Sequence, residues 1–160
     1  MSAKKAPIAL VRLVVPAGAA KPSPPVGPAL GQHGVNIMSF CKEFNAKTSE
    51  HKSEVPVPVE IAIYGDKSFS WRAKTPPTSY FIAKAAGVTK SSARPGHAHA
   101  GSINLKHAYE IAKVKASDET MGHVGLESAT KSVLGTARAM GIRVVDPRAT
   151  SANASSEVAR

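Results

Sequence analysis

The chain has 160 residues, with 21 basic and 11 acidic side chains and a single cysteine, Cys41. This length suffices for one ordinary domain or two small ones. The net charge of +10 points to a polyanionic partner, with nucleic acid as the first choice and an anionic membrane as the second. The lone cysteine excludes a disulfide framework and fits a reducing compartment. No apolar run approaches the ~20 residues that a membrane span requires.

Alternating apolar residues in the first half predict a three-stranded antiparallel sheet. We expect a strand over residues 7–15 and a hairpin over residues 57–73, with its turn at Gly65-Asp66-Lys67. Between them, Asn36 caps a predicted amphipathic helix whose apolar stripe consists of Ile37, Phe40, Cys41 and Phe44. Residues 1–74 are therefore predicted to form an N-terminal α+β domain.

The paired prolines at residues 75–77 interrupt this pattern. Proline cannot donate to a sheet ladder and stiffens the chain, so we expect a short hinge linker here. Residues 78–148 are predicted to form a C-terminal three-helix domain. The small polar residues of 149–160 predict a disordered tail. The fold class is thus α+β.

Three helices are expected in the second half of the chain. They are predicted over residues 78–86, 104–115 and 126–140, with an irregular loop over 88–102 and a short extended end over 142–145. The apolar side of the middle helix is assigned to Leu105, Ala108, Tyr109 and Ala112.

The loop over residues 88–102 combines the residue types that bind phosphate. Lys90 and Arg94 supply charge, and the neighbouring hydroxyls and glycines supply hydrogen bonds and close backbone approach. Residues 84–115 hold six basic side chains against one acidic side chain, Glu110. RNA recognition by shape and an ordinary solvated polar loop are both compatible with this composition, and the concentrated charge favours RNA.

The segment over residues 16–28 holds five of the 12 prolines. Proline fixes φ, so this segment presents a preordered surface that loses little entropy on binding. A plain structural connection between strand and helix is the alternative interpretation.

Catalytic and metal sites are not predicted. His97, His99 and His107 lack the cysteine or carboxylate partners of a closed metal site. No nucleophile–base or carboxylate pair stands out, so we expect no enzyme activity and no cofactor. The aromatic residues Phe40, Phe44, Phe69 and Trp71 lie on core stripes and are predicted to pack rather than to stack on bases.

Long motifs in this sequence resemble one family. They read PSPPVGPALGQ over 22–32, GVNIM over 34–38 and FCKEFNAKT over 40–48, and continue with KTPP over 74–77, KAAG over 84–87 and GTARAMG over 135–141. They are similar to the eleventh large-subunit ribosomal protein family over about residues 7–146. The resemblance implies a C-terminal domain that binds large-subunit rRNA at the GTPase-associated centre. It also implies an N-terminal domain that meets stalk proteins, translational GTPases and release factors.

The resemblance also assigns residues to these roles. The rRNA contacts would come from Thr89, Lys90, Ser91, Ser92, Arg94, Pro95 and Gly96 in the loop and from Thr130, Lys131, Gly135, Thr136, Arg138 and Met140 in the last helix. The factor-facing cleft at the stalk base, where thiopeptide antibiotics bind in bacterial members, would be formed by Pro22, Ser23, Pro24, Pro25 and Gln32. Lys42 falls at a position that is methylated in bacterial relatives.

Two departures from the bacterial pattern indicate an organelle. The loop reads SSARPGH over 91–97, where bacterial members are richer in glycine and lysine, and residues 77–81 and 105–115 are more similar to mitochondrial members. We expect a mitochondrial ribosome, with a bacterial or plastid ribosome as the alternative. A small basic DNA-binding module is the other function to consider, although the last helix offers only Lys131 and Arg138 as cations, opposed by Glu127.

Overall fold

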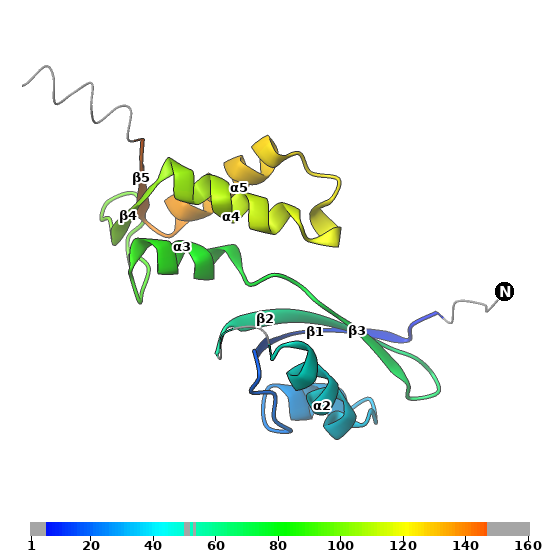
Figure 1. Ribbon diagram of the computed structural model, residues 1–160. Helices are drawn as coiled ribbons and strands as arrows, with labels where there is room; N and C mark the ends of the chain where they lie inside the picture. Colours follow the sequence, from blue (N-terminus) through cyan, green and yellow to red (C-terminus); the bar gives the residue numbers. More distant parts are fainter. Residues whose placement is uncertain (1–5, 50–51, 53, 147–160) are drawn as a thin grey trace, which may run out of the picture. The chain divides into compact units, whose positions relative to one another are not determined.

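The computed structural model describes residues 6–49, 52 and 54–146. The chain divides into two compact units, Met1–Pro76 and Pro77–Arg160 (Figure 1). Each unit has its own hydrophobic core. The predicted tail over 149–160 lies outside the described residues.

The first unit contains a three-stranded antiparallel sheet with the order β1-β2-β3, as predicted. Its strands are β1 (Ala9–Pro16), β2 (Pro56–Ile63) and β3 (Phe69–Ala73). In the register, Ile61 pairs with Val11 on one side and with Trp71 on the other. The pleat buries alternate residues of β2, so one face of the sheet carries the core while the other is open to solvent.

Helix α2 (Ile37–Lys47) covers the apolar face of this sheet (Figure 1). Asn36 caps the helix as predicted, because its Oδ1 accepts hydrogen bonds from the amides of Met38 and Ser39. Phe40 and Phe44 are fully buried, and burial of each ring contributes roughly 1.5–3 kcal/mol. The predicted packing role of the aromatic residues is confirmed.

A short helix, α1 (Val26–Gly31), begins within the last residues of the predicted proline-rich segment. Sequence periodicity did not predict it because six residues are too few to show a helical pattern. Pro28 is tolerated because it occupies the first turn, where a backbone amide has no intrahelical partner.

The second unit contains the three predicted helices: α3 (Thr78–Ala86), α4 (Leu105–Ala116) and α5 (Leu126–Ala139). Their core is built from Ile82 of α3, Ala108, Ile111 and Ala112 of α4, and Ala129, Val133 and Ala137 of α5. The many alanines permit close helix packing. A turn of 3₁₀ helix (Glu119–Met121) lies in the connection between α4 and α5.

The predicted loop over 88–102 is wrong at its end. Residues Gly101–Asn104 form strand β4, which pairs in parallel with β5 (Ile142–Val145), so the loop ends at Ala100. The extended end over 142–145 is found as β5, but β4 and the pairing were not predicted, because four-residue strands whose partners lie about forty positions apart leave no local periodicity.

The predicted apolar side of α4 is also partly wrong. Tyr109 is 46% exposed and Leu105 is 38% exposed, whereas Ile111 is buried with Ala108 and Ala112. The helix has two adjacent apolar arcs, one that contains Leu105 and Tyr109 and one that contains Ile111, and the prediction chose the first. Packing against α5 selects the arc that contains Ile111.

Candidate nucleic-acid interface

The loop between α3 and β4 begins at a fixed helix end. Gly87 adopts the left-handed conformation, with φ +67°, and its amide donates to the carbonyl oxygens of Ala83 and Lys84. The amide of Val88 also donates to Ala83 O at 3.0 Å. These bonds are typical of a glycine helix terminus and set the direction in which the loop leaves α3.

The loop is also attached to the C-terminal end of α5. The Ser92 amide donates to Met140 O at 3.0 Å, and the Ala100 amide donates to Gly141 O at 2.9 Å. Gly141 has φ +69°, and a Cβ atom built there would lie 2.5 Å from the Ser92 Cβ. Only glycine therefore fits where the loop crosses the helix end.

The tip of the loop is a tight turn centred on Arg94. Ser92 Oγ accepts a hydrogen bond from the Arg94 amide at 3.1 Å, and Arg94 O accepts from the amides of His97 and Ala98 at 3.1 and 3.0 Å. These three hydrogen bonds hold the shape of the turn. The Arg94 side chain is exposed and forms no ion pair with any other described residue.

The predicted loop residues share one exposed surface. Thr89, Lys90, Ser91, Arg94, Pro95 and Gly96 are exposed, and Ser92 is half-buried against the end of α5. Lys90, like Arg94, has no acidic partner among the residues that the structure describes. The charge of this surface is therefore available to a phosphate.

Three of the predicted residues of helix α5 lie on the side away from its core face, whereas Thr130 and Thr136 are half-buried and Met140 packs against the core. Its buried face holds Ala129, Val133 and Ala137, while Lys131, Gly135 and Arg138 are exposed. Lys131 pairs with Glu127 at 2.7 Å, but both side chains are more than 70% exposed, so the pair is weak and open to competition.

The two threonines of α5 point their hydroxyl hydrogens back into the helix. Thr130 Oγ1 donates to Leu126 O at 2.8 Å and Thr136 Oγ1 donates to Ser132 O at 2.9 Å. Each hydroxyl oxygen can still accept a hydrogen bond, and a 2′-hydroxyl group of RNA can donate one.

The structure brings only part of the predicted site together. Ser92 and Met140 are joined directly by a hydrogen bond, and Thr136 and Arg138 lie within the last turn of α5. Thr130 lies roughly 15 Å from Met140 along the helix axis, because ten positions separate them and each helical residue rises about 1.5 Å. The predicted residues therefore form an elongated surface.

The predicted proline-rich residues belong to the first unit. Pro22, Ser23, Pro24, Pro25 and Gln32 are all exposed. The segment that precedes these residues is bound to Asn45 of α2 and to Thr48, which caps the C-terminal end of that helix. Thr48 Oγ1 accepts a hydrogen bond from the Gly18 amide at 3.1 Å, and Asn45 exchanges two hydrogen bonds with the Ala20 backbone. This segment is therefore anchored to the helix.

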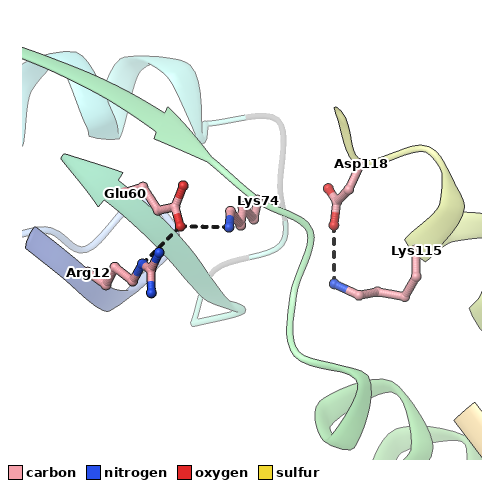
Figure 2. A network of polar contacts seen from close by, with 5 residues as sticks. All are labelled: Arg12, Glu60, Lys74, Lys115 and Asp118. Atoms are coloured by element: carbon pink, nitrogen blue, oxygen red, sulfur yellow. Dashed lines mark hydrogen bonds and ion pairs between the residues drawn. The ribbon is translucent and has the colours of Figure 1, made fainter. Parts of the chain in front are cut away.

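An ion-pair network lies on the solvent face of the sheet in the first unit. Glu60 Oε1 accepts from Lys74 Nζ at 2.8 Å and from Arg12 Nε at 3.0 Å (Figure 2). The hydrogen bond from Lys74 holds the pKa of the Glu60 carboxyl below its ordinary value. In the second unit, Lys115 pairs with Asp118 at 3.2 Å (Figure 2). These pairs are structural contacts and lie outside the predicted RNA surface.

The described parts of the chain contain no group of three or more His, Cys, Asp or Glu side chains that could hold a metal ion. No helix among them has the length and apolar character to cross a bilayer. Cys41 is buried in the core, and this burial raises the pKa of its thiol.

One hollow of about 490 Å³ lies beside the loop, and the sequence did not predict it. Its lining includes His99, Leu105 and Arg143, none of which was assigned to the RNA surface, together with Arg138. Arg143 lies on β5, which was predicted as a short extended end, but the pairing of that strand with β4 was not predicted, so no signal connected Arg143 with the loop.

The second unit is small and holds an exposed basic loop against the end of a helix, and such a basic surface is a common feature of nucleic-acid-binding domains. Two family models match the chain. Ribosomal protein L11, N-terminal domain, matches residues 11–69, and Ribosomal protein L11, RNA binding domain, matches residues 74–144. The chain belongs to the ribosomal protein L11 family, which confirms the resemblance found in the sequence. It is a large-subunit ribosomal protein that binds rRNA in the ribosome, and its family is structural rather than enzymatic.

Proposed function

We propose that the second unit binds large-subunit rRNA at the GTPase-associated centre, the stalk base. The RNA surface consists of the predicted loop residues and the exposed side of α5. In this proposal the proline-rich surface of the first unit faces stalk proteins, translational GTPases and release factors. The ribosome concerned is the mitochondrial one.

The observation that carries the RNA surface is the exposed glycine in the middle of α5. A Cβ atom at Gly135 would meet nothing within 4 Å, so the fold itself does not require glycine there. Glycine in a helix interior is nevertheless unfavourable by about 0.5–1 kcal/mol relative to alanine. Close approach of a partner's backbone explains why this cost is tolerated, and the neighbouring Lys131 and Arg138 make that partner an anion.

The loop adds charge to the same surface. The bond between Ser92 and Met140 holds the exposed cations of Lys90 and Arg94 beside the last turn of α5. An RNA backbone that follows the exposed side of α5 would meet the loop without any change in protein conformation. Such a preformed surface suits recognition of a folded RNA by its shape.

A competition experiment tests the RNA assignment. The full chain is bound to an rRNA fragment of the GTPase-associated centre and challenged with duplex DNA or with unstructured RNA of equal length. We expect the fragment to be retained. Release by either competitor at equal concentration would contradict the proposal and would revive the DNA-binding alternative.

The factor-facing assignment is tested with Pro25→Ala, because Pro25 is exposed in the anchored proline-rich segment. Stimulated GTP hydrolysis on reconstituted ribosomes is expected to fall while rRNA affinity stays near normal. Pro7→Ala, also at an exposed proline of the first unit, is the matched control. Loss of rRNA binding in Pro25→Ala would overturn this division of roles.

The mitochondrial assignment is supported by the loop sequence SSARPGH over 91–97 and by residues 105–115. Sedimentation of cell fractions tests it. The chain should migrate with mitochondrial large subunits, and migration with the large subunits of another compartment would contradict the assignment.

A further inference from the structure

The hollow beside the loop combines two arginines with an apolar wall. It lies between the loop, the start of α4, the end of α5 and strand β5. Its volume of about 490 Å³ falls within the range of small-molecule sites, roughly 300–1,000 Å³. The wall includes Leu105, Leu134 and Val144.

The arginines of the hollow have unused donors. Arg138 and Arg143 are exposed, and neither forms an ion pair with another described residue. A guanidinium group offers five donors that match phosphate oxygens. The hollow can therefore hold an anionic group at its rim.

The apolar wall indicates more than a bare anion. Leu105 leaves 38% of its surface exposed beside these cations, whereas Ile111 of the same helix is buried in the core. Asp146 also lines the hollow, and its carboxylate disfavours a site for anions alone. His99 adds an aromatic ring of the kind on which bases stack. The combination fits a planar ring that carries a phosphate.

We propose that this hollow receives one unstacked nucleotide of the bound RNA. The base would lie against Leu105, Leu134 and Val144, and its phosphate would meet both Arg138 and Arg143. This inference rests on the proposed function, because Gly96 and Arg138 belong both to the hollow and to the RNA surface. An RNA strand that contacts the loop thus needs only to extrude one base to fill it.

Nuclear magnetic resonance of the ¹⁵N-labelled full chain tests the hollow directly. The probes are adenosine 5′-monophosphate, uridine 5′-monophosphate, ribose 5-phosphate and inorganic phosphate. We expect the two nucleotides to shift the amide signals of Leu105, Arg143 and Val144, and the two base-free probes to shift these signals far less. Equal shifts from inorganic phosphate would show a simple anion site and overturn the proposal.

Arg143→Ala gives a second test outside the residues that were assigned to the RNA surface. Loss of one charge-assisted hydrogen bond should weaken nucleotide binding about fivefold. Arg143→Lys, which keeps the charge, should weaken it less. Lys113→Ala removes an exposed cation of α4 outside the hollow and is the matched control, expected to leave nucleotide binding unchanged.

The rRNA fragment separates this inference from the proposed function. Arg143→Ala should also weaken fragment binding, and photo-crosslinking should join one nucleotide of the fragment to a residue that lines the hollow. If the fragment binds normally and no crosslink forms there, the hollow proposal fails while the RNA surface stands. If free nucleotides enter the hollow but the fragment does not bind, the site serves free nucleotides and both RNA proposals fail.

Discussion

Gly141 and Ser92 are packed so closely that any side chain at position 141 would overlap Ser92. A methyl group there would lie 2.5 Å from the Ser92 Cβ and 3.1 Å from Ala98 O. The Ser92 amide is bound to Met140 O in the same place. This contact holds the basic loop against the end of α5, so the loop and the helix present one surface.

Gly141→Ala is therefore expected to destabilise the chain by about 2–4 kcal/mol, because left-handed strain of about 1–2 kcal/mol is combined with the overlap. Urea unfolding measures the free-energy difference. Gly87→Ala is the matched control, since Gly87 has φ +67° and nothing within 4 Å of its added Cβ. Equal losses in the two variants would show that the contact with Ser92 is unimportant.

Gly135→Ala is expected to separate stability from binding. The added methyl meets no other atom of the chain, so the free protein should gain about 0.5–1 kcal/mol of stability from the better helix former. Affinity for the rRNA fragment should fall, because the methyl occupies the space that the RNA backbone approaches. Thermal unfolding and equilibrium binding measure the two effects. A stabilised variant with unchanged affinity would remove Gly135 from the RNA surface.

Thr48→Val tests the anchor of the proline-rich segment. Thr48 is 2% exposed, and its hydroxyl accepts from Gly18 N and donates to Phe44 O. Removing the hydroxyl leaves the Gly18 amide without this partner, at a cost of about 0.5–1.5 kcal/mol, the net contribution of one hydrogen bond. Hydrogen exchange at the Gly18 amide should accelerate in Thr48→Val but not in Thr48→Ser, which keeps the hydroxyl. Similar acceleration in both variants would contradict this anchoring role.

The Glu60 network predicts a pH dependence of stability. Because the hydrogen bond from Lys74 lowers the pKa of Glu60 in the folded chain, its contribution is present above the unfolded pKa of about 4.3 and is lost as pH falls through the lower folded value. Wild type should be more stable than Glu60→Gln at pH 7. Unfolding between pH 7 and 2.5 should show this advantage shrinking below about pH 4. An advantage that grows on acidification would contradict the assignment.

Much of the fold follows from local patterns. The period of two in β2 and the stripe of Phe40, Cys41 and Phe44 in α2 are properties of neighbouring residues, and both elements form where they are predicted. The parallel pair β4 and β5 could not be predicted because its register, such as Ile103 opposite Val144, joins distant segments. Tyr109 was misplaced because its helix has two apolar arcs and only tertiary packing chooses between them.

The candidate site was predictable in its residue types but not in its construction. The loop composition and the family motifs identify the cations that face solvent. The attachment of the loop to α5 depends on Ser92 and Gly141, which are far apart in sequence and share no motif. Arg143 and Leu105 were not assigned to the site for the same reason, since only the fold brings them to one hollow.

The salt dependence of rRNA binding tests the central claim most directly. If the full chain neutralises roughly six phosphates, log K should fall linearly with log salt, with a slope of about −0.7 to −0.9 per contact. Arg94→Ala should lower the affinity and reduce the magnitude of this slope by about one contact, whereas Lys42→Ala, at an exposed cation of the first unit, should change neither. Binding that does not depend on salt, or identical slopes in wild type and Arg94→Ala, would contradict an RNA interface at this loop.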